Sequence, residues 1–449
     1  MKVGISALQI DFPKLYLPIE VLAENRNIEP LKLIKGLGLQ RMSFPDVHQD
    51  TVCFAANALL KLLAAEQIHP QEIDRIYVGT ESGVDSSKPV ASFLLPLVEE
   101  KYGENSTQHC DVVDLTFACI GAVDAMQTCL DYVRLRPEKK CIVIASDVAK
   151  YDLASGGEYT QGSGAVAILI EANPKMLSFD LTTGVSTEGV FDFFKPRRTV
   201  SKNEIQEISN NTEWQGVLEN EISIYKEQPV FDGQYSNECY INRIKSAYFH
   251  FKNQKTSEKA CFDNWEFIAM HLPYCFQGRR TFQHIVAEEY PNAVEEQSGE
   301  TFAEKLKAFT KSEFYRKLVT EKLYPSEVAS AKVGNIYTGS IFLGLASALY
   351  YKKEKELTSN KIGFIAYGSG SKSKVFEAEL EGSWKSQIAK TNLFEELEKT
   401  TAIDFKTYEA LHKKELTNSL IQASNEVVLI GIEKENPVLI GKRNYVFKA

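Results

Sequence analysis

The sequence predicts an α/β protein with a duplicated core. Residues 76–79 and 141–145 are continuous apolar runs without alternation, which is typical of strands in sheets covered on both faces. In both halves of the chain, strand patterns alternate with helical spacings, and glycine-rich or small-residue loops follow the strands. A length of 449 residues suits one large duplicated unit or two to three domains. We therefore expect ligand chemistry at the carboxyl ends of the strands.

The first half shows a regular succession of strands and helices. Asp50 has the chemistry of an N-cap for the helix that follows it. The strand at 110–115 looks buried and passes through a small-residue turn into a helix. We expect strands at residues 3–10, 73–80, 110–115, 140–146 and 165–171, and helices at 19–24, 30–35, 50–63, 91–99 and 123–133.

The second half begins with a less regular region. Residues 180–260 are more polar, and we interpret them as an inserted cap of loops and amphipathic helices. The predicted organisation is an N-terminal half at 1–175, a cap region at 176–260 and a C-terminal half at 261–449. In the last part we expect strands at 267–272 and 361–366, helices at 301–323 and 334–350, and a hairpin of 427–432 with 438–440.

The composition excludes several classes of protein. A formal net charge of -9 argues against nucleic acid as a partner, which would require a basic face. No run approaches the roughly 20 apolar residues of a membrane span, and the chain opens on a strand pattern without a signal peptide. The eight cysteines form no C-x-x-C pair, which indicates reduced thiols rather than disulfides or a metal site. We expect a cytoplasmic protein without a bound metal.

Cys119 lies where the strand ending at Leu115 passes into a helix. The unpaired N–H groups and the dipole of a helix N-terminus favour a thiolate. The small residues Ala118, Gly121 and Ala122 let a thioester approach the backbone closely. A free cysteine is more often a small core residue, but this context predicts a nucleophile.

Other motifs support that prediction. Besides the cysteine turn at 119, they are TESGVD at 80–85, SGGEYTQGSGAVA at 155–167, DFFKP at 192–196, DGQYSNECYI at 232–241, HLPYC at 271–275, VGNIYTGS at 333–340 and YGSGS at 367–371. In this order and at this spacing, over nearly the whole chain, they resemble the 3-hydroxy-3-methylglutaryl-CoA (HMG-CoA) synthase family of the thiolase-like superfamily. The resemblance implies a thiolase-like core with α/β/α/β/α layers.

The resemblance also implies an acyltransferase of the mevalonate pathway of isoprenoid biosynthesis. Cys119 takes an acetyl group from acetyl-CoA, and Glu81 removes a proton from the acetyl methyl. The carbanion attacks the ketone of acetoacetyl-CoA, which His271 polarises, and water releases HMG-CoA. A thioester requires a soft nucleophile such as cysteine. A carboxylate on a loop after an apolar strand can be partly desolvated, which raises its pKa towards the working pH.

Further residues complete the predicted site. Asn335 can donate to a carbonyl oxygen, and the backbone around Ser369 can bind an oxyanion. From the family motifs, Asp147 and Asp192 are expected to orient His271 or the loop that closes the site. The substrate contacts predicted with Asn335 and Ser369 are Thr160, Ser236 and Arg280. No cofactor other than the substrates is expected.

Taken singly, these residues have purely structural explanations. Glu81 can be a surface carboxylate, and His271 can be a satisfied core histidine. Asn335 can cap the following helix, and the glycines around Ser369 can form a tight turn. Only their joint occurrence in the order of the family favours the catalytic interpretation.

The chain departs from the family pattern at two positions. Ile120 stands where an aromatic residue usually follows the cysteine, which questions a contact with the acyl chain. Phe276 stands where many members have a lysine, while Arg280, with Arg279 beside it, keeps a basic position nearby. An arginine holds a phosphate bidentately and can compensate for the lysine.

Three functions therefore remain open. The first is HMG-CoA synthase acting on CoA thioesters. The second is the polyketide β-branching type, which takes its donor acetyl group from an acyl-carrier protein. The third is a non-catalytic protein that only binds acyl thioesters. By analogy with the superfamily we expect a homodimer.

Overall fold

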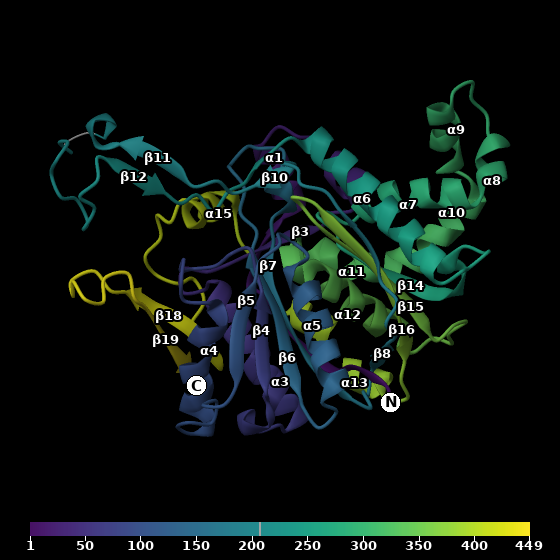
Figure 1. Ribbon diagram of the computed structural model, residues 1–449. Coiled ribbons are helices and arrows are strands. Elements are labelled where there is room, and N and C mark those ends of the chain that lie inside the picture. Colours follow the sequence, from purple (N-terminus) through teal and green to yellow (C-terminus); the bar gives the residue numbers. More distant parts are fainter. Residues whose placement is uncertain (206–207) are drawn as a thin grey trace.

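One large mixed sheet runs through the molecule (Figure 1), and the computed structural model describes residues 1–205 and 208–449. Within these residues the sheet has ten strands in the order β14-β15-β16-β8-β1-β7-β6-β4-β5, with β9 paired to β16. Their bounds are β1 (Val3–Asp11), β4 (Arg75–Gly79), β5 (Asp111–Leu115), β6 (Cys141–Val148), β7 (Ser163–Ala172), β8 (Leu177–Phe179), β9 (Gly184–Thr187), β14 (Trp265–Met270), β15 (Lys361–Gly368) and β16 (Lys372–Leu380).

The two halves of the sheet meet at a short seam between β1 and β8. Gly4 faces Ser178 and Ile5 faces Leu177 in an antiparallel register. A Cβ atom on Gly4 would lie 1.8 Å from the carbonyl oxygen of Leu177, so only glycine allows this approach.

Helices cover the sheet on both sides and also fill the space between its halves (Figure 1). Apolar residues of α3 and α4 pack on the outer face of the N-terminal half, and those of α6 and α7 pack on the outer face of the C-terminal half. Between the halves, α5 and α12 share one core. The layers are therefore α/β/α/β/α, as predicted. These helices are α3 (Thr51–Glu66), α4 (Val90–Tyr102), α5 (Gly121–Leu135), α6 (Gly233–Gln254), α7 (Gln277–Glu289) and α12 (Ser340–Lys352).

The order of elements repeats along the chain. The series β1, α3, β4, α5, β6, β7 in the first half corresponds to β8 with β9, α6, β14, α12, β15, β16 in the second. The duplicated core predicted from the sequence is thus confirmed by the topology.

The strand β5 differs from its expected burial. It is the last strand of the sheet, and Asp111 and Val113 are exposed. The expectation of a buried strand was wrong because one edge of β5 has no neighbour in the described part of the chain.

The segment 176–260 contains both core and peripheral elements. The strands β8 and β9 belong to the large sheet, and α6 packs on it. Between β9 and α6, residues 188–205 and 208–231 form an extension that we call the arm; Figure 1 shows its β11–β12 hairpin projecting from the body. The domain boundaries at 176 and 260 stay a prediction. The arm contains β10 (Phe193–Phe194) paired with β13 (Val230–Phe231), and β11 (Arg198–Ser201) paired with β12 (Glu221–Ile224).

The region 291–333 consists of shorter helices than expected. Thr301 forms a capping box with Glu304, and Ser312 caps the next helix by accepting from the Tyr315 N–H. These caps divide the predicted helix 301–323. The helices here are α8 (Pro291–Glu295), α9 (Phe302–Phe309), α10 (Glu313–Leu318), a π-helical turn (Val319–Leu323) and α11 (Tyr324–Val333).

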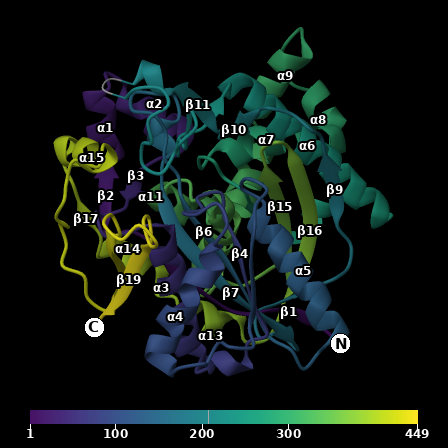
Figure 2. The ribbon, with the colours of Figure 1, turned by 60° about the vertical axis from the view of Figure 1, so that its left-hand side comes forward.

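The C-terminal segments lie along the flank of the N-terminal half (Figure 2). There β17 pairs with β2, which pairs with β3, and α15 lies beside α1. The bounds are β2 (Leu15–Pro18), α1 (Ile19–Asn25), α2 (Pro30–Leu37), β3 (Arg41–Phe44), α13 (Trp384–Ala389), α14 (Leu393–Glu398), β17 (Thr401–Ala402) and α15 (Phe405–His412).

A C-terminal hairpin forms, but its second strand is not the predicted one. β18 (Glu426–Ile432) pairs with β19 (Arg443–Lys448), whereas residues 438–440 lie in the connecting turn, where Val438 is 88% exposed. The apolar run at 438–440 was misleading because the residues that pack on the core, Tyr445 and Phe447, lie further along the chain, in β19.

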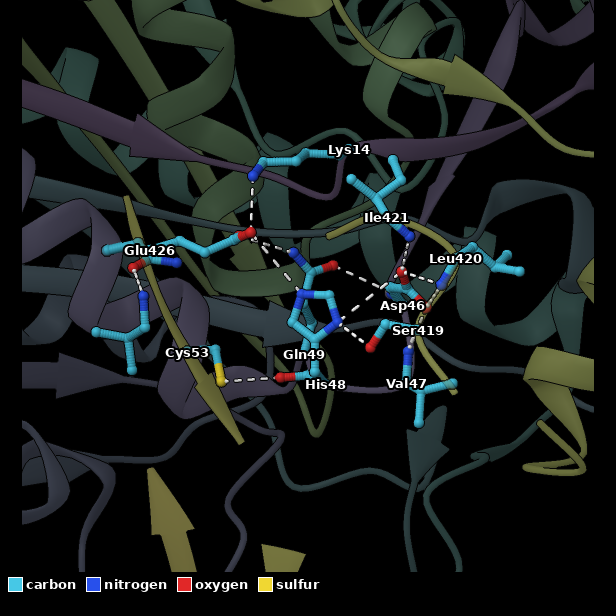
Figure 3. A network of polar contacts seen from close by, with 12 residues as sticks. Lys14, Asp46, Val47, His48, Gln49, Cys53, Ser419, Leu420, Ile421 and Glu426 are labelled. Carbon is cyan, nitrogen blue, oxygen red and sulfur yellow. Dashed lines mark hydrogen bonds and ion pairs between the residues drawn. The ribbon is translucent and has the colours of Figure 1, made fainter. Parts of the chain in front are cut away.

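A polar network joins this C-terminal region to the N-terminal half (Figure 3). The Lys14 ammonium lies 2.7 Å from Glu426, and the Asp46 carboxylate accepts from the N–H of Leu420 at 2.8 Å. The His48 Nδ1 lies 2.6 Å from the Ser419 hydroxyl.

No described helix has the length and apolar character needed to cross a membrane.

Candidate active site

A cavity of about 250 Å³ opens at the carboxyl ends of strands from both halves. His271 follows β14, Ser369 follows β15, and Cys119 lies between β5 and α5. The predicted site residues that line the cavity are Cys119, Thr160, Ser236, His271, Arg280, Asn335 and Ser369. The other three, Glu81, Asp147 and Asp192, contact residues of the site from outside the cavity lining.

Cys119 is held by a tight turn between strand and helix. Ala118 has φ of 40°, in the left-handed region that a residue with a Cβ rarely adopts. Gly121 begins α5, and a Cβ there would lie 2.5 Å from the Leu115 carbonyl oxygen. The turn therefore brings the thiol to the start of the helix, as the sequence predicts.

The thiol of Cys119 is protonated and bonded to a carboxylate. It donates to Glu81 Oε1 at 3.1 Å, and the residue is only 8% exposed. Burial and then the negative charge of Glu81 raise the pKa of Cys119 well above its ordinary value. Burial and Glu81 thus oppose the thiolate that the helix N-terminus favours. Glu81 is instead placed to receive the thiol proton.

Asp147 organises the backbone around Glu81. The carboxylate of Asp147 accepts from the Glu81 N–H at 2.9 Å, from the Thr80 hydroxyl at 3.0 Å and from the Thr338 N–H at 3.0 Å. Burial and the charge of Glu81 raise the pKa of Asp147 to about 6. Asp147 therefore connects the base in the N-terminal half to the start of α12, and it does not contact His271.

His271 is neutral in this site. Its backbone N–H donates to the Ile365 carbonyl at 3.0 Å, and Tyr240 donates to its carbonyl oxygen. Burial lowers the pKa of His271 to about 3, and its Nδ1 has no hydrogen-bond partner among the described residues. A neutral imidazole at the cavity wall can donate one hydrogen bond to a carbonyl oxygen.

Asp192 holds the loop that carries Ser369. It accepts from the Tyr367 hydroxyl and from the Gly370 N–H, both at 2.6 Å. A Cβ on Gly368 would lie 2.7 Å from the Phe117 carbonyl oxygen, so this loop packs closely on the cysteine turn. Of the two roles expected for Asp192, the geometry therefore favours orientation of the loop.

Asn335 and Thr160 are joined through the backbone. The Asn335 N–H donates to the Thr160 carbonyl at 2.9 Å, and Asn335 Oδ1 accepts from the Tyr337 N–H at 2.8 Å. The Thr160 hydroxyl donates to the Gly157 carbonyl at 2.7 Å. The side-chain amide nitrogen of Asn335 thus stays available to a ligand, while its oxygen fixes the turn before α12.

The two neighbouring arginines have different environments. Arg279 is bound to Glu327 through Nε at 2.8 Å and stacks at 3.7 Å over the Phe276 ring. Arg280 lines the cavity and contacts neutral groups, the Tyr274 hydroxyl at 3.2 Å and a backbone carbonyl. Arg280 is therefore the one of the pair that is placed to bind an anion.

Several residues near Cys119 were not predicted. Lys195 forms an ion pair with Glu81, and Tyr151, Phe193 and Tyr337 surround the sulfur. Lys195 and Phe193 lie in the DFFKP motif, which was the signal for them. Ile120 is fully buried in the central core, so the residue after the cysteine is not part of the cavity lining here. In the described chain no cluster of three or more His, Cys, Asp or Glu is suited to a metal ion.

Comparisons with known proteins identify the family of the chain. Models of the hydroxymethylglutaryl-coenzyme A synthase N-terminal and C-terminal families match residues 1–175 and 221–427. Hydroxymethylglutaryl-CoA synthase of Enterococcus faecalis is 30% identical over 445 residues, covering 99% of this chain and 100% of that protein. A solved structure of MvaS in complex with 3-hydroxy-3-methylglutaryl coenzyme A has a TM-score of 0.83 at 26% identity, covering 100% of this chain and 99% of that one. The HMG synthase of the curacin pathway, solved with holo donor-ACP, shares the fold with a TM-score of 0.77 at 19% identity and full coverage of both chains.

Proposed function

Because the chain belongs to the hydroxymethylglutaryl-CoA synthase family, we propose that it condenses acetyl-CoA, acetoacetyl-CoA and water to HMG-CoA and CoA. The observation that carries this proposal is the Cys119 thiol, which is hydrogen-bonded to Glu81 in a cavity that His271 also lines.

In the first step, Cys119 becomes acetylated. Glu81 accepts the thiol proton, the sulfur attacks the thioester carbonyl, and CoA leaves as its thiol by taking a proton back. The short contact between Sγ and Oε1 supports this transfer. The pair is buried, so the charge forms in a site of low dielectric where a local base is needed.

In the second step, a carbon–carbon bond forms. Glu81 removes a proton from the acetyl methyl, and the resulting enolate carbon attacks the ketone of acetoacetyl-CoA. Neutral His271 donates a hydrogen bond to the ketone oxygen as it gains charge, and the protonated Glu81 carboxyl then gives the methyl proton to this oxygen. Water then cleaves the thioester to Cys119, which regains its proton and releases HMG-CoA. No metal or redox group takes part in this scheme.

The remaining residues hold the substrates. Asn335 donates to a thioester carbonyl oxygen, and the backbone at Ser369 binds the oxyanion. Arg280 contacts a phosphate of CoA at the cavity, because it is the cation there without a carboxylate partner among the described residues. Thr160 and Ser236 line the path of the acyl chain.

The test of the reaction is mass spectrometry of the intact protein after incubation with acetyl-CoA. The wild-type protein gains one acetyl group on Cys119, and Cys119→Ser gains none. Acetyl label retained by Cys119→Ser contradicts the nucleophile assignment. An unmodified wild-type protein supports instead a protein that only binds acyl thioesters.

One observation favours a second candidate for the donor. Phe276 occupies the position where many family members have lysine, and its ring is covered by Arg279. The polyketide β-branching type takes the acetyl group from an acyl-carrier protein. The experiment compares acetyl-CoA with an acetylated carrier protein at equal concentration, and the faster acetylation of Cys119 identifies the donor.

We further propose a homodimer located in the cytoplasm. One edge of β5 has no neighbouring strand among the described residues, and Val113 is 38% exposed, which supports pairing with a second copy. All eight cysteines of the chain lie in its described part and are free thiols, which suits a reducing compartment.

A further inference from the structure

Lys195 is the cation closest to the proposed base. It lies in the arm, directly after β10, and its side chain is only 12% exposed. Its ammonium lies 3.4 Å from Glu81 Oε2 and donates to the Glu81 backbone carbonyl at 3.2 Å. It also lies 4.5 Å from the centre of the Tyr337 ring. These three contacts fix the ammonium against one carboxylate.

The carboxylate of Glu81 is oriented by its two neighbours. Oε1 accepts from the Cys119 thiol at 3.1 Å, while Oε2 faces Lys195. Because a carboxylate is planar, an ammonium bound to one oxygen directs the other oxygen towards the sulfur. Without Lys195, rotation of the carboxylate would no longer be restricted from that side.

The ionisable groups around Lys195 are mostly acids. Burial raises the pKa of Asp147 to about 6 and that of Cys119 well above normal, and in both cases the positive charge of Lys195 opposes the rise. His271 is neutral and supplies no charge. The titratable groups facing this cluster are Glu81, Cys119, Asp147, Tyr151, Tyr225 and Tyr337.

The arm anchors Lys195 from the opposite half of the molecule. Three residues upstream, Asp192 binds Tyr367 and Gly370 of the C-terminal half. The adjacent Phe193 packs on Tyr151, 6.3 Å between ring centres. The segment 192–195 therefore spans from the Ser369 loop to the base.

We propose that Lys195 is a positioning residue, which holds the Glu81 carboxylate turned towards Cys119. This proposal rests on the function proposed above, because Glu81 acts as the base only in that reaction. Lys195 is not among the residues that line the cavity, so it acts through Glu81.

The test measures the reactivity of Cys119 as a function of pH. The rate of alkylation by iodoacetamide is followed on the Cys119 peptide by mass spectrometry for the wild type, Lys195→Met and Lys195→Arg. In Lys195→Met the pH midpoint of alkylation rises by about one unit, because an opposite charge nearby is lost. In Lys195→Arg the pH midpoint of alkylation lies close to that of the wild type, because arginine keeps the positive charge. Condensation at pH 7 falls about tenfold or more in Lys195→Met, mainly in kcat.

The matched control is Lys226→Met. Lys226 is a lysine of the same arm that pairs with Asp152 at 2.7 Å, away from the Glu81 carboxylate. We expect Lys226→Met to leave the pH midpoint of Cys119 alkylation and kcat unchanged. An unchanged midpoint in Lys195→Met, even with reduced activity, overturns the proposal. Should Lys195→Met not fold, Lys195→Gln carries the same test. Alkylation needs no acetyl-CoA, so a wild-type protein that is not acetylated refutes the reaction without refuting this role.

Discussion

The central residue pair is a buried thiol and the carboxylate that accepts its hydrogen bond. Because burial and Glu81 raise the pKa of Cys119, the nucleophile forms only when the proton moves to a nearby acceptor. In the proposed reaction the thiol thus stays neutral, and so resists oxidation better than a thiolate, until a thioester is in place.

Substitution of Glu81 by alanine separates the two steps. Glu81→Ala acetylates more slowly than the wild type, because the acceptor of the thiol proton is lost, although loss of the negative charge also lowers the pKa of Cys119 towards its ordinary value. Condensation fails, because no base is left to take the methyl proton. The measurement is acetyl incorporation by mass spectrometry beside product formation. Normal HMG-CoA formation by this variant removes Glu81 from the role of base.

The buried side chain of Gln277 lowers the stability of the fold. It lines the cavity, is 3% exposed, and its Oε1 has no partner among the described residues. An unsatisfied buried acceptor costs about 1–3 kcal/mol. Gln277→Leu therefore raises the free energy of unfolding by about 1 kcal/mol and raises KM, measured by denaturant unfolding and kinetics. The control is Gln283→Leu, at a half-buried position of the same helix outside the cavity lining, which leaves KM unchanged.

At the scale of elements, Asp50 joins α3 to the C-terminal hairpin. One oxygen caps α3 through the Val52 and Cys53 N–H groups at 3.0 and 3.1 Å. The other accepts from Arg443 at 3.0 Å and from the Tyr445 hydroxyl at 2.8 Å. The hairpin and the helix thus depend on one side chain.

Asp50→Ala is expected to weaken both elements. Loss of an N-cap costs about 0.5–2 kcal/mol, and β19 loses its two polar anchors. Hydrogen exchange shows faster exchange in 443–448, and denaturant unfolding shows the lower stability. Asp50→Asn keeps the helix cap and therefore loses less stability than Asp50→Ala. Equal exchange in β19 of Asp50→Ala and wild type contradicts this link.

Most elements could be predicted from the sequence because their signals are local. The cap at Asp50 and the apolar runs of β4 and β6 depend on neighbours in the chain. The edge position of β5 and the true second strand of the hairpin depend on distant partners, so their residue patterns were misleading. The same holds for Lys195, whose contact with Glu81 spans 114 residues and has no local signal apart from its motif.

For the whole molecule, the C-terminal region adds an acid-sensitive link. Burial alone would raise the pKa of Glu426, but His48 and Lys14 outweigh burial and lower it to about 2. A depressed pKa stabilises the fold above the ordinary value of 4.5, and this contribution is lost as the pH falls towards 2. Wild type therefore loses stability between pH 4.5 and 2, whereas Glu426→Gln shows a smaller change there. The free energies of unfolding of both proteins, measured between pH 4.5 and 2, test this prediction.

The proposed dimer is tested at the edge of the sheet. A lysine on an exposed edge strand prevents pairing with another chain. Val113→Lys therefore shifts the protein from dimer to monomer in light scattering after size exclusion, while Leu135→Lys, at the exposed end of α5, does not. A wild-type monomer refutes the dimer outright.

The seam at Gly4 and Leu177 determines how the polypeptide can be divided. Cys119 and Glu81 belong to one side, and His271 and Asn335 to the other, so a chain cut between β7 and β8 leaves each fragment with only part of the chemistry. Co-expression of the two fragments would restore turnover only if the β1–β8 pairing and the core shared by α5 and α12 form again. Gly4→Ala in such a split protein would weaken complementation, because the single added methyl group would collide with the Leu177 carbonyl oxygen.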